Sequence, residues 1–394
     1  MSSNLTLRKY SRIFTRPELP YFLIIWSTVF LCALGLTMVL SASTVKSLQE
    51  SGNTYSIFIR QFFFLILGAM ATYWAYRVQG GIWQRIAKIS LSISIVILLL
   101  PFIPNLGKNI NGNRNWIEIL GFTLQPSEFA KFGLILWCAL QLRNIDVSTK
   151  GKNPFIAILP GLVIIEGLIL MERDLGTALL ILLIFAGILF TTGAPIKHFI
   201  IVAALGVIVG GAFIISSSYR VSRFGALFNP FDERYYKFSG WQPAHSIMGL
   251  ASGGLWGSGL GGSKQKWANL AEAHTDFIFS VIGEELGLLG TLLVLGLYAA
   301  LIYAMLRVAL KTKDSFSRYA TAGVACWFIV QVGVNIGSVT SIIPVIGVTL
   351  PLISYGGSSL LANLLAIGYV LGVARRTPEI SDGIKANRIR KLNR

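Results

Sequence analysis

Long apolar stretches recur along this chain, and each is long enough to cross a membrane as a helix. Roughly 20 apolar residues cross the ~30 Å hydrocarbon core of a bilayer as an α-helix. Helix is required there because lipid cannot satisfy the hydrogen-bonding groups of the backbone. The sequence therefore predicts an all-α polytopic membrane protein of about ten transmembrane helices. We place them at about 21–41, 57–76, 85–104, 126–143, 154–171, 175–193, 197–216, 277–308, 318–339 and 352–374.

The composition excludes several other classes of protein. Charged residues make up 13% of the chain, whereas a soluble domain carries about 25%. The net charge of +17 would suggest nucleic acid in a soluble chain, but we attribute it to membrane topology and expect no nucleic-acid partner. Cys32, Cys138 and Cys326 each lie inside an apolar stretch, and the three histidines are widely spaced. We therefore expect neither a disulfide framework nor a zinc site.

The basic residues are distributed unevenly between the two sides of the predicted helices. The termini and the short connections on one side carry most of the 34 Lys and Arg residues, while the short loops on the other side hold Lys46, Lys108, Arg114 and Arg173. The positive-inside rule then puts both termini in the cytoplasm. This predicts a cytoplasmic segment at 1–20, a ten-helix membrane domain at 21–374 and a basic cytoplasmic tail at 375–394.

One predicted connection is much longer than the others. Residues 217–276 form a large extracytoplasmic loop of about sixty residues between helices 7 and 8, and loops of that length are usually functional. Because long loops translocate regardless of charge, topology does not explain the basic residues within it. They are Arg220, Arg223, Arg234, Lys237, Lys264 and Lys266.

Ionisable side chains also lie inside the predicted helices or at their outer ends. Each costs at least about 2.5–3.5 kcal/mol near the centre of a bilayer and is a candidate for function. They could simply pair with one another, but as a set they favour a polar cavity that opens to the outer face. Its basic groups suit a phosphorylated lipid, because guanidinium groups bind phosphate in a bidentate manner. The set comprises Arg60, Glu118, Glu128, Lys131, Glu166, Glu172, Arg173, Asp174, Glu284 and Glu285.

Four separated blocks carry a resemblance to a known family. They read NGNRNWIEILGFTLQPSEFAK (111–131), RDLGTALL (173–180), EAHTDFIFSVIGEELG (272–287) and TLPLISYGGSSLL (349–361). With these blocks, the ten predicted helices and the long loop, the chain resembles the SEDS family (shape, elongation, division and sporulation), which includes FtsW, RodA and SpoVE. The resemblance covers essentially the whole chain, and the GEELG form at 283–287 is most similar to the division branch.

The resemblance implies the SEDS fold and an activity in the bacterial cytoplasmic membrane. A member of this family is expected to be a peptidoglycan glycosyltransferase that polymerises lipid II, an undecaprenyl-pyrophosphate-linked disaccharide pentapeptide, into glycan strands. Its expected partners are a cognate class B penicillin-binding protein, which supplies transpeptidation, and other divisome proteins. The division branch implies a location at the septum.

The resemblance also implies that Asp276 is the essential acid. Glycosyl transfer from a lipid pyrophosphate needs a base for the acceptor hydroxyl, but the weakly basic leaving group needs no general acid. One carboxylate then suffices, unlike the pair in most glycosidases. We predict that Asp276 is the catalytic base. Glu284 and Glu285 would lie about 12 Å deeper along a helix that includes Asp276, so we expect them to pair with cations or shape the cavity.

Other side chains are candidates for holding the substrate and shaping its site. The predicted substrate-binding residues are Arg114, Lys131, Arg220 and Arg223, followed by Lys264 and Lys266. The predicted structural or cavity-shaping residues are Glu128, Asp174, Glu284, Glu285, Ser354 and Tyr355. A divalent cation such as Mg²⁺ or Mn²⁺ could share in neutralising the pyrophosphate, although the sequence contains no dedicated metal cage.

Two further functions and two related branches stay open at this point. The chain could be a transporter that flips lipid II, or a non-enzymatic scaffold for division proteins. It could also be the elongation or sporulation paralogue with the same chemistry. A transporter predicts inverted repeats with broken helices, and the sequence shows no convincing repeat. Its polar groups concentrate towards the outer face, which favours chemistry there.

Overall fold

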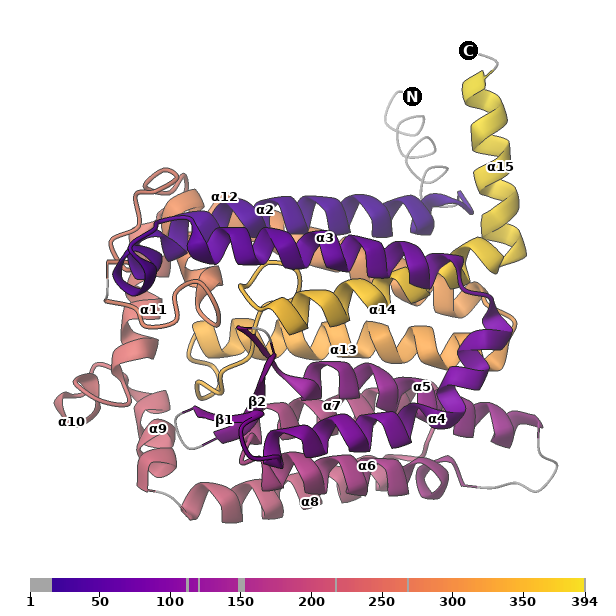
Figure 1. Cartoon of the computed structure of the whole chain (residues 1–394), viewed down its shortest axis with the longest axis horizontal. Coiled ribbons are helices and arrows are strands. Elements are labelled where there is room, and N and C mark those ends of the chain that lie inside the picture. The colour runs from indigo at the N-terminus through magenta and orange to yellow at the C-terminus, as the bar shows by residue number, and fades with distance from the viewer. Residues whose placement is uncertain are drawn as a thin grey trace, which may run out of the picture.

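Long helices run side by side along the longest axis of the molecule (Figure 1). The computed structural model describes residues 16–110, 113–119, 121–147, 153–216, 218–267 and 269–392. Its long helices are α2 (Leu19–Ser51), α3 (Ser56–Arg77), α4 (Gly80–Leu99), α5 (Pro126–Val147), α6 (Pro154–Met171), α7 (Leu175–Thr191), α8 (Ile196–Ile215), α12 (Ile278–Lys311), α13 (Ser315–Val339) and α14 (Gly357–Arg376). Each lies at the position of a predicted membrane span.

Apolar length identifies most of these helices as able to cross a membrane. Within the described residues, seven are long and apolar enough, namely α2, α3, α4, α6, α12, α13 and α14. Helices α7 and α8 are apolar but offer shorter runs, and α5 carries Glu128 and Lys131 in its first turns. The prediction of an all-α, multi-pass membrane protein is confirmed, and the count of ten spans stays a prediction.

The two ends of the bundle differ. At one end, which we call the loop end, lie the short helices α9 (Ser218–Phe228), α10 (Glu233–Tyr236) and α11 (Trp241–Ser252) (Figure 1). At the other, the tail end, α15 (Pro378–Leu392) leaves the bundle beside the start of α2. Parts of three predicted segments lie outside the described residues: 1–15 at the N-terminus, 217 and 268 in the loop and 393–394 in the tail. The side of the membrane that each end faces stays a prediction.

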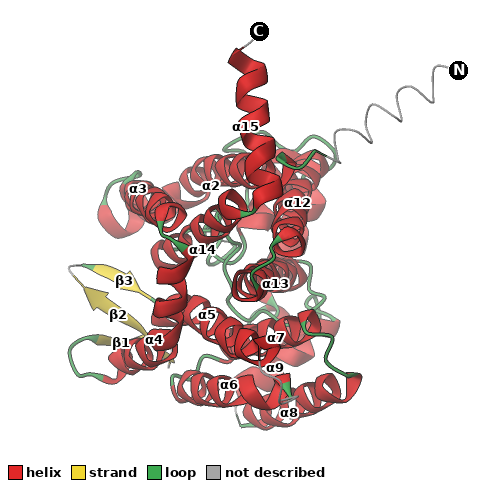
Figure 2. Cartoon of the chain, turned by 90° about the vertical axis from the view of Figure 1, so that its right-hand side faces the viewer, coloured by secondary structure: helices red, strands yellow, loops and turns green. Residues whose placement is uncertain are grey.

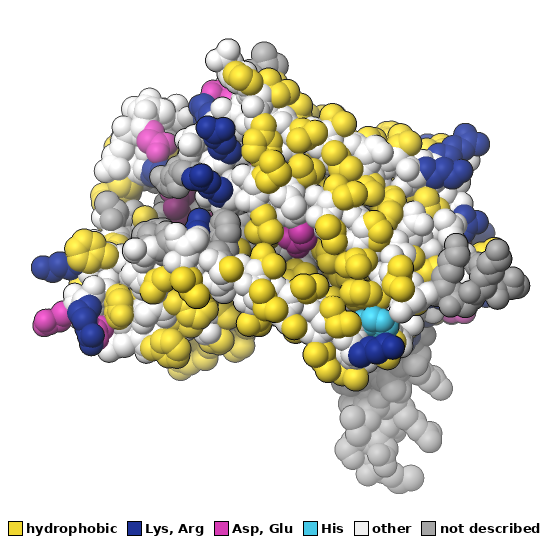
Figure 3. All heavy atoms as spheres, turned by 90° about the horizontal axis from the view of Figure 1, so that it is seen from below, with side chains coloured by type: hydrophobic (Ala, Val, Ile, Leu, Met, Phe, Trp, Pro, Cys, Tyr) yellow, Lys and Arg dark blue, Asp and Glu magenta, His cyan; other side chains and the backbone are white. Residues whose placement is uncertain are grey.

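Helices α13 and α14 form the centre of the bundle (Figure 2). Helix α13 packs against α5, α7 and α12, and α14 packs against α3. Both central helices are buried along most of their length, whereas the outer helices expose large apolar side chains on the surface of the bundle (Figure 3). The centre of the bundle is therefore formed by the two helices on either side of the TLPLISYGG stretch at 349–357.

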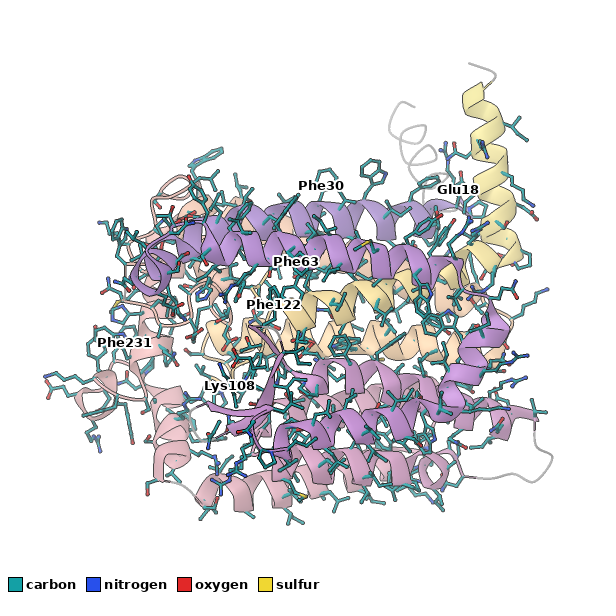
Figure 4. All side chains as sticks on the ribbon, in the orientation of Figure 1. Glu18, Phe30, Phe63, Lys108, Phe122 and Phe231 are labelled. Carbon is teal, nitrogen blue, oxygen red and sulfur yellow. The ribbon has the colours of Figure 1, made fainter. Side chains whose placement is uncertain are left out.

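A small β-sheet covers part of the loop end, where the sequence analysis expected no strands. Strands β1 (Gly107–Ile110), β2 (Asn113–Ile119) and β3 (Phe122–Leu124) are antiparallel in the order β1-β2-β3, after the short 3₁₀ helix η1 (Leu100–Phe102). Strand β2 buries Asn115 and Ile117, which lie two residues apart and so share one face of the strand. Phe122 stacks on Phe63 of α3, with ring centroids 5.6 Å apart (Figure 4).

Helix α12 is interrupted at Gly287, where φ is 66° and ψ is −163°. The interruption frees main-chain groups that a continuous helix would use. The carbonyl groups of Glu284 and Glu285 accept hydrogen bonds from the N–H groups of Ser258 and Gly259, at 2.9 and 3.0 Å. The long loop is therefore joined to the first part of α12 by its backbone.

We expect Gly287→Ala to lower the free energy of unfolding by about 1–3 kcal/mol, because this backbone conformation is essentially restricted to glycine. A Cβ at Gly287 would also lie 2.4 Å from the main-chain nitrogen of Gly257. The measurement is thermal unfolding of the purified protein in detergent. The matched control is Gly296→Ala in the same helix, where a Cβ meets nothing within 4 Å. Equal melting temperatures for the two variants would contradict this account.

Candidate functional site

Asp276 lies at the loop end, immediately before α12, in a turn held by the TLPLISYGG stretch. The Ser354 hydroxyl donates a hydrogen bond to the Thr275 carbonyl at 2.6 Å. The Tyr355 N–H donates to the His274 carbonyl at 2.9 Å. Two motif blocks far apart in the sequence therefore form one structural unit, and this unit fixes the backbone that carries Asp276.

Two amide side chains from the membrane helices complete this unit. Asn335 of α13 donates from Nδ2 to the carbonyl oxygens of Asp276 and Val348, at 2.8 and 2.6 Å. Gln61 of α3 donates to the Ser354 carbonyl at 3.1 Å. The sequence analysis did not single out either amide. The available signal was a polar amide within an apolar span, which lipid would not tolerate without a partner.

The environment of the Asp276 carboxyl favours the protonated form. Burial raises its pKa to about 7, the carboxylates of Glu272 and Asp174 contribute to the rise, and Arg223 and Lys46 oppose it. Gly347 faces the carboxylate, since a Cβ there would lie 3.5 Å from Asp276 Oδ2. A carboxyl with a pKa near 7 exchanges its proton readily at neutral pH, which suits a general base.

Lys46 is a member of the site that the sequence analysis assigned to a short loop. Helix α2 extends to Ser51, ten residues beyond the predicted end of the first span at 41, so Lys46 lies on a helix. It forms an ion pair with Glu272 at 3.0 Å. The side chains that set the charge around Asp276 thus come from α2, α7, α9 and the loop before α12.

The structure places Asp174 at the start of α7, where it caps the helix. Its Oδ1 accepts a hydrogen bond from the Thr177 N–H at 2.9 Å. Its Oδ2 accepts from Asn115 of β2 at 2.7 Å and from Gln125, which precedes α5, at 3.0 Å. Asp174 therefore joins the first two motif blocks to each other, within electrostatic reach of Asp276.

Glu172 precedes Asp174 and is completely buried. Neither of its carboxyl oxygens has a hydrogen-bond partner within the described residues. Burial raises its pKa to about 9, and the neighbouring Asp174 carboxylate adds to the rise. Glu172 is therefore protonated at neutral pH, since a charge there would be costly.

Lys131 and Glu128 form a buried ion pair on α5, with 2.9 Å between Nζ and Oε1 and side-chain exposures of 0% and 7%. Lys131 also donates to Gln331 Oε1 at 3.1 Å. Gln331 in turn donates to the Thr349 carbonyl at 3.0 Å, at the start of the TLPLISYGG stretch. The ammonium group of Lys131, a predicted substrate-binding group, is thus bound to internal partners in the core.

Glu284 and Glu285 hold the loop against α12. Glu285 forms an ion pair with Lys266 at 3.0 Å and accepts a hydrogen bond from Ser41 at 2.7 Å. Glu284 accepts from the Lys264 N–H at 2.8 Å. Lys266 is buried against Glu285, while the Lys264 side chain is exposed.

The remaining predicted substrate-binding residues lie on α9 and β2. Arg223 donates to the Val345 carbonyl at 3.0 Å, and its charge reaches Asp276. Arg220 donates to the Ser216 hydroxyl at 3.2 Å, and Arg114 on β2 is exposed. Lys and Arg side chains gather around a recess at the loop end (Figure 3).

One further side chain bears on the chemistry of the site. Burial lowers the pKa of His274 to about 4, so it is neutral at pH 7.

Among the described residues, no three His, Cys, Asp or Glu side chains cluster in a way that could hold a metal ion. Participation by Mg²⁺ or Mn²⁺ stays a prediction.

Comparison with known proteins identifies relatives of the whole chain. The family model of FtsW, RodA and SpoVE, described as cell cycle protein, matches residues 22–379. A relative from Mycobacterium tuberculosis, named probable peptidoglycan glycosyltransferase FtsW, is 38% identical over 381 residues. That match covers 96% of this chain and 72% of the relative.

Solved structures show the same architecture. One, described as "Structural coordination of polymerization and crosslinking by a peptidoglycan synthase complex", matches with a TM-score of 0.69 and 28% identity, over 89% of this chain and 98% of the other. The rod shape determining protein RodA of Thermus thermophilus matches with a TM-score of 0.65 and 28% identity, over 90% and 96%. The predicted SEDS fold is thereby confirmed.

The raised pKa of Asp276 predicts a specific pH dependence of stability. A carboxyl whose pKa is higher in the folded state stabilises the fold at acid pH, and this contribution is lost as the pH rises through about 7. We therefore expect Asp276→Asn to melt at a higher temperature than the wild type at pH 8, with the difference shrinking towards pH 5. Thermal unfolding across that range is the measurement. A difference that grows towards pH 5 would contradict the assigned direction.

Proposed function

This chain belongs to the FtsW, RodA and SpoVE family of cell cycle proteins, and we propose that it is a peptidoglycan glycosyltransferase that polymerises lipid II in septal cell-wall synthesis. One observation carries the assignment of chemistry to the loop end. Asn335 binds the main-chain carbonyl of Asp276 and so fixes its position at the loop end. The Asp276 carboxyl lies within reach of the charges of Arg223 and Lys46, and its pKa is about 7. The name of the Mycobacterium tuberculosis relative supports the same reaction.

In this mechanism the Asp276 carboxylate accepts the proton of the acceptor sugar hydroxyl. The hydroxyl oxygen attacks the anomeric carbon of the donor and forms the new glycosidic bond. The bond from that carbon to the pyrophosphate oxygen breaks, and undecaprenyl pyrophosphate leaves with the electron pair. His274 beside Tyr355 is neutral at pH 7, so it adds no positive charge that would lower the pKa of the Asp276 carboxyl.

The leaving pyrophosphate needs positive charge on the same face as Asp276. We assign this role first to Arg223, whose guanidinium is bonded to the Val345 carbonyl and whose charge reaches Asp276. Arg220, Arg114 and Lys264 remain candidates at the rim. Lys131 and Lys266 are paired with Glu128 and Glu285, so we assign them to holding the helices and the loop rather than to the substrate.

The proposal extends to partners and location. A structural relative is a peptidoglycan synthase complex, which supports a class B penicillin-binding protein as the transpeptidase partner, together with other divisome proteins. The distribution of basic residues supports cytoplasmic termini. The loop end then faces outward, at the division septum, where lipid II presents its headgroup.

We expect Asp276→Asn to lower the rate of glycan polymerisation by about 10²–10⁴-fold, the usual loss when a general base is removed. The assay uses the purified protein with its transpeptidase partner and fluorescent lipid II. The control is Asp232→Asn, a loop acid paired with Arg234 on the exposed α10 region, which should polymerise normally. Undiminished polymerisation by Asp276→Asn would remove Asp276 from the reaction. Lipid II translocation in proteoliposomes with no polymer from any variant would instead favour the flippase.

The pH profile gives an independent check on the base. The Glu272 carboxylate raises the pKa of Asp276, and Lys46 opposes it. In Glu272→Gln the opposing charge of Lys46 remains, so the acid limb of kcat/KM should move to lower pH. Glu233→Gln on α10 is the control and should leave the limb in place. A shift of the Glu272→Gln limb to higher pH would show that another group titrates.

A further inference from the structure

Two adjoining cavities lie at the tail end, far from Asp276, and they share Tyr76 of α3. The first, of about 460 Å³, is lined by Arg77, Arg375, Arg376 and the turn between α3 and α4. We call it the basic cavity. The second, of about 530 Å³, lies between α2, α3 and α14 and is lined mainly by apolar side chains. We call it the apolar groove, and its volume is in the range of ligand sites.

The arginines of the basic cavity are tied to the walls of the apolar groove. The Arg375 guanidinium lies 5.0 Å from the centre of the Tyr76 ring, and that of Arg77 lies 5.6 Å from the Tyr73 ring. Both tyrosines line the apolar groove. Cation–π contacts of this kind hold a guanidinium in place while leaving its N–H groups exposed. The two cavities therefore adjoin at Tyr76, with the arginines of the basic cavity beside the tyrosines of the apolar groove.

Arg376 has a different role from the other two arginines. Its Nη1 donates to the Val78 carbonyl at 2.7 Å, which fixes the turn between α3 and α4 on the end of α14. Arg77 and Arg375 are exposed at the mouth of the basic cavity. Arg376 is exposed as well, but its Nη1 is bonded to Val78. We therefore assign Arg77 and Arg375 to a ligand that enters from the lipid at the tail end.

Tyrosines line the apolar groove next to the basic cavity, and small side chains line it farther along α2 and α3. The Tyr21 hydroxyl lies 3.4 Å from the Tyr76 hydroxyl, and Ala33 and Ala69 line the deeper part. Among the described residues, neither cavity is lined by Asp or Glu. An apolar groove beside a cavity lined by arginines and by no acidic residue suits an acyl chain that carries a negative headgroup.

We propose that the two cavities bind an anionic phospholipid from the leaflet at the tail end. Its phosphate binds Arg77 and Arg375, because guanidinium groups suit the bidentate recognition of phosphate oxygens. One acyl chain lies in the apolar groove between α2, α3 and α14. A zwitterionic lipid should bind more weakly, because the ammonium group of its headgroup is repelled by the same two arginines. This site is separate from the proposed glycosyl transfer at the opposite end.

The test measures lipid retention by native mass spectrometry of the full-length protein, titrated with phosphatidylglycerol or phosphatidylcholine in detergent. We expect one phosphatidylglycerol to be retained in preference to phosphatidylcholine. The double substitution Arg77→Gln with Arg375→Gln should weaken that retention by about fivefold per charge removed. The control, Arg85→Gln with Lys88→Gln, removes the same charge from exposed positions on α4 outside both cavities, and it should bind as the wild type does.

A second pair of variants tests the apolar groove without changing charge. Ala33→Phe fills the groove and should also weaken retention, whereas Val96→Phe on the exposed surface of α4 should not. Equal retention of both lipids by the wild type would overturn the proposal, as would equal losses in the arginine variant and its control. Binding of glycerophosphoglycerol, which lacks acyl chains, as tightly as the lipid would equally overturn it.

Discussion

The hydrogen bonds from the TLPLISYGG stretch to His274 and Thr275 are the contacts on which the loop end depends. The stretch at 349–357 has irregular backbone between two buried helices, so its main-chain groups need partners that lipid cannot supply. The His274 carbonyl accepts a hydrogen bond from the Tyr355 N–H. Gln61 donates to the Ser354 carbonyl, and Asn335 donates to the carbonyl of Val348, just before the stretch. Because the main chain of this stretch needs hydrogen-bond partners, its bonds fix the position of the turn before α12.

The buried ion pair on α5 supports the same stretch from within the core. Lys131 and Glu128 are costly to bury, and removing one partner of such a pair typically costs about 3–5 kcal/mol. Gln331 accepts a hydrogen bond from Lys131 and donates one to the Thr349 carbonyl, which connects the ion pair to the stretch. This buried ion pair therefore supports the irregular stretch at the loop end, and it has almost no contact with solvent.

Apolar run length was enough to predict the helices but not the contacts between them. The span predicted at 154–171 coincides with α6, and that at 175–193 ends within two residues of α7, because lipid allows little besides helix. The sheet at 107–124 was missed because its strands are short and their pairing depends on docking against α3. Lys46 was missed because α2 continues as helix beyond its apolar part. The partners of Lys266 and Asp174 depend on folding across the chain, which spacing within one segment does not reveal.

The bonds that position Asp276 end on backbone atoms of residues 274–276, not on its carboxyl group. Asn335 binds the Asp276 carbonyl oxygen, and Ser354 and Tyr355 bind the two residues before it. A group that gains and loses a proton in every turnover would otherwise break and remake its own supports. Here the charge state of the side chain can cycle while the framework around it stays the same. Backbone carbonyl groups fix the position of Asp276, and its carboxyl group carries the proton. Each turnover can therefore begin from the same geometry.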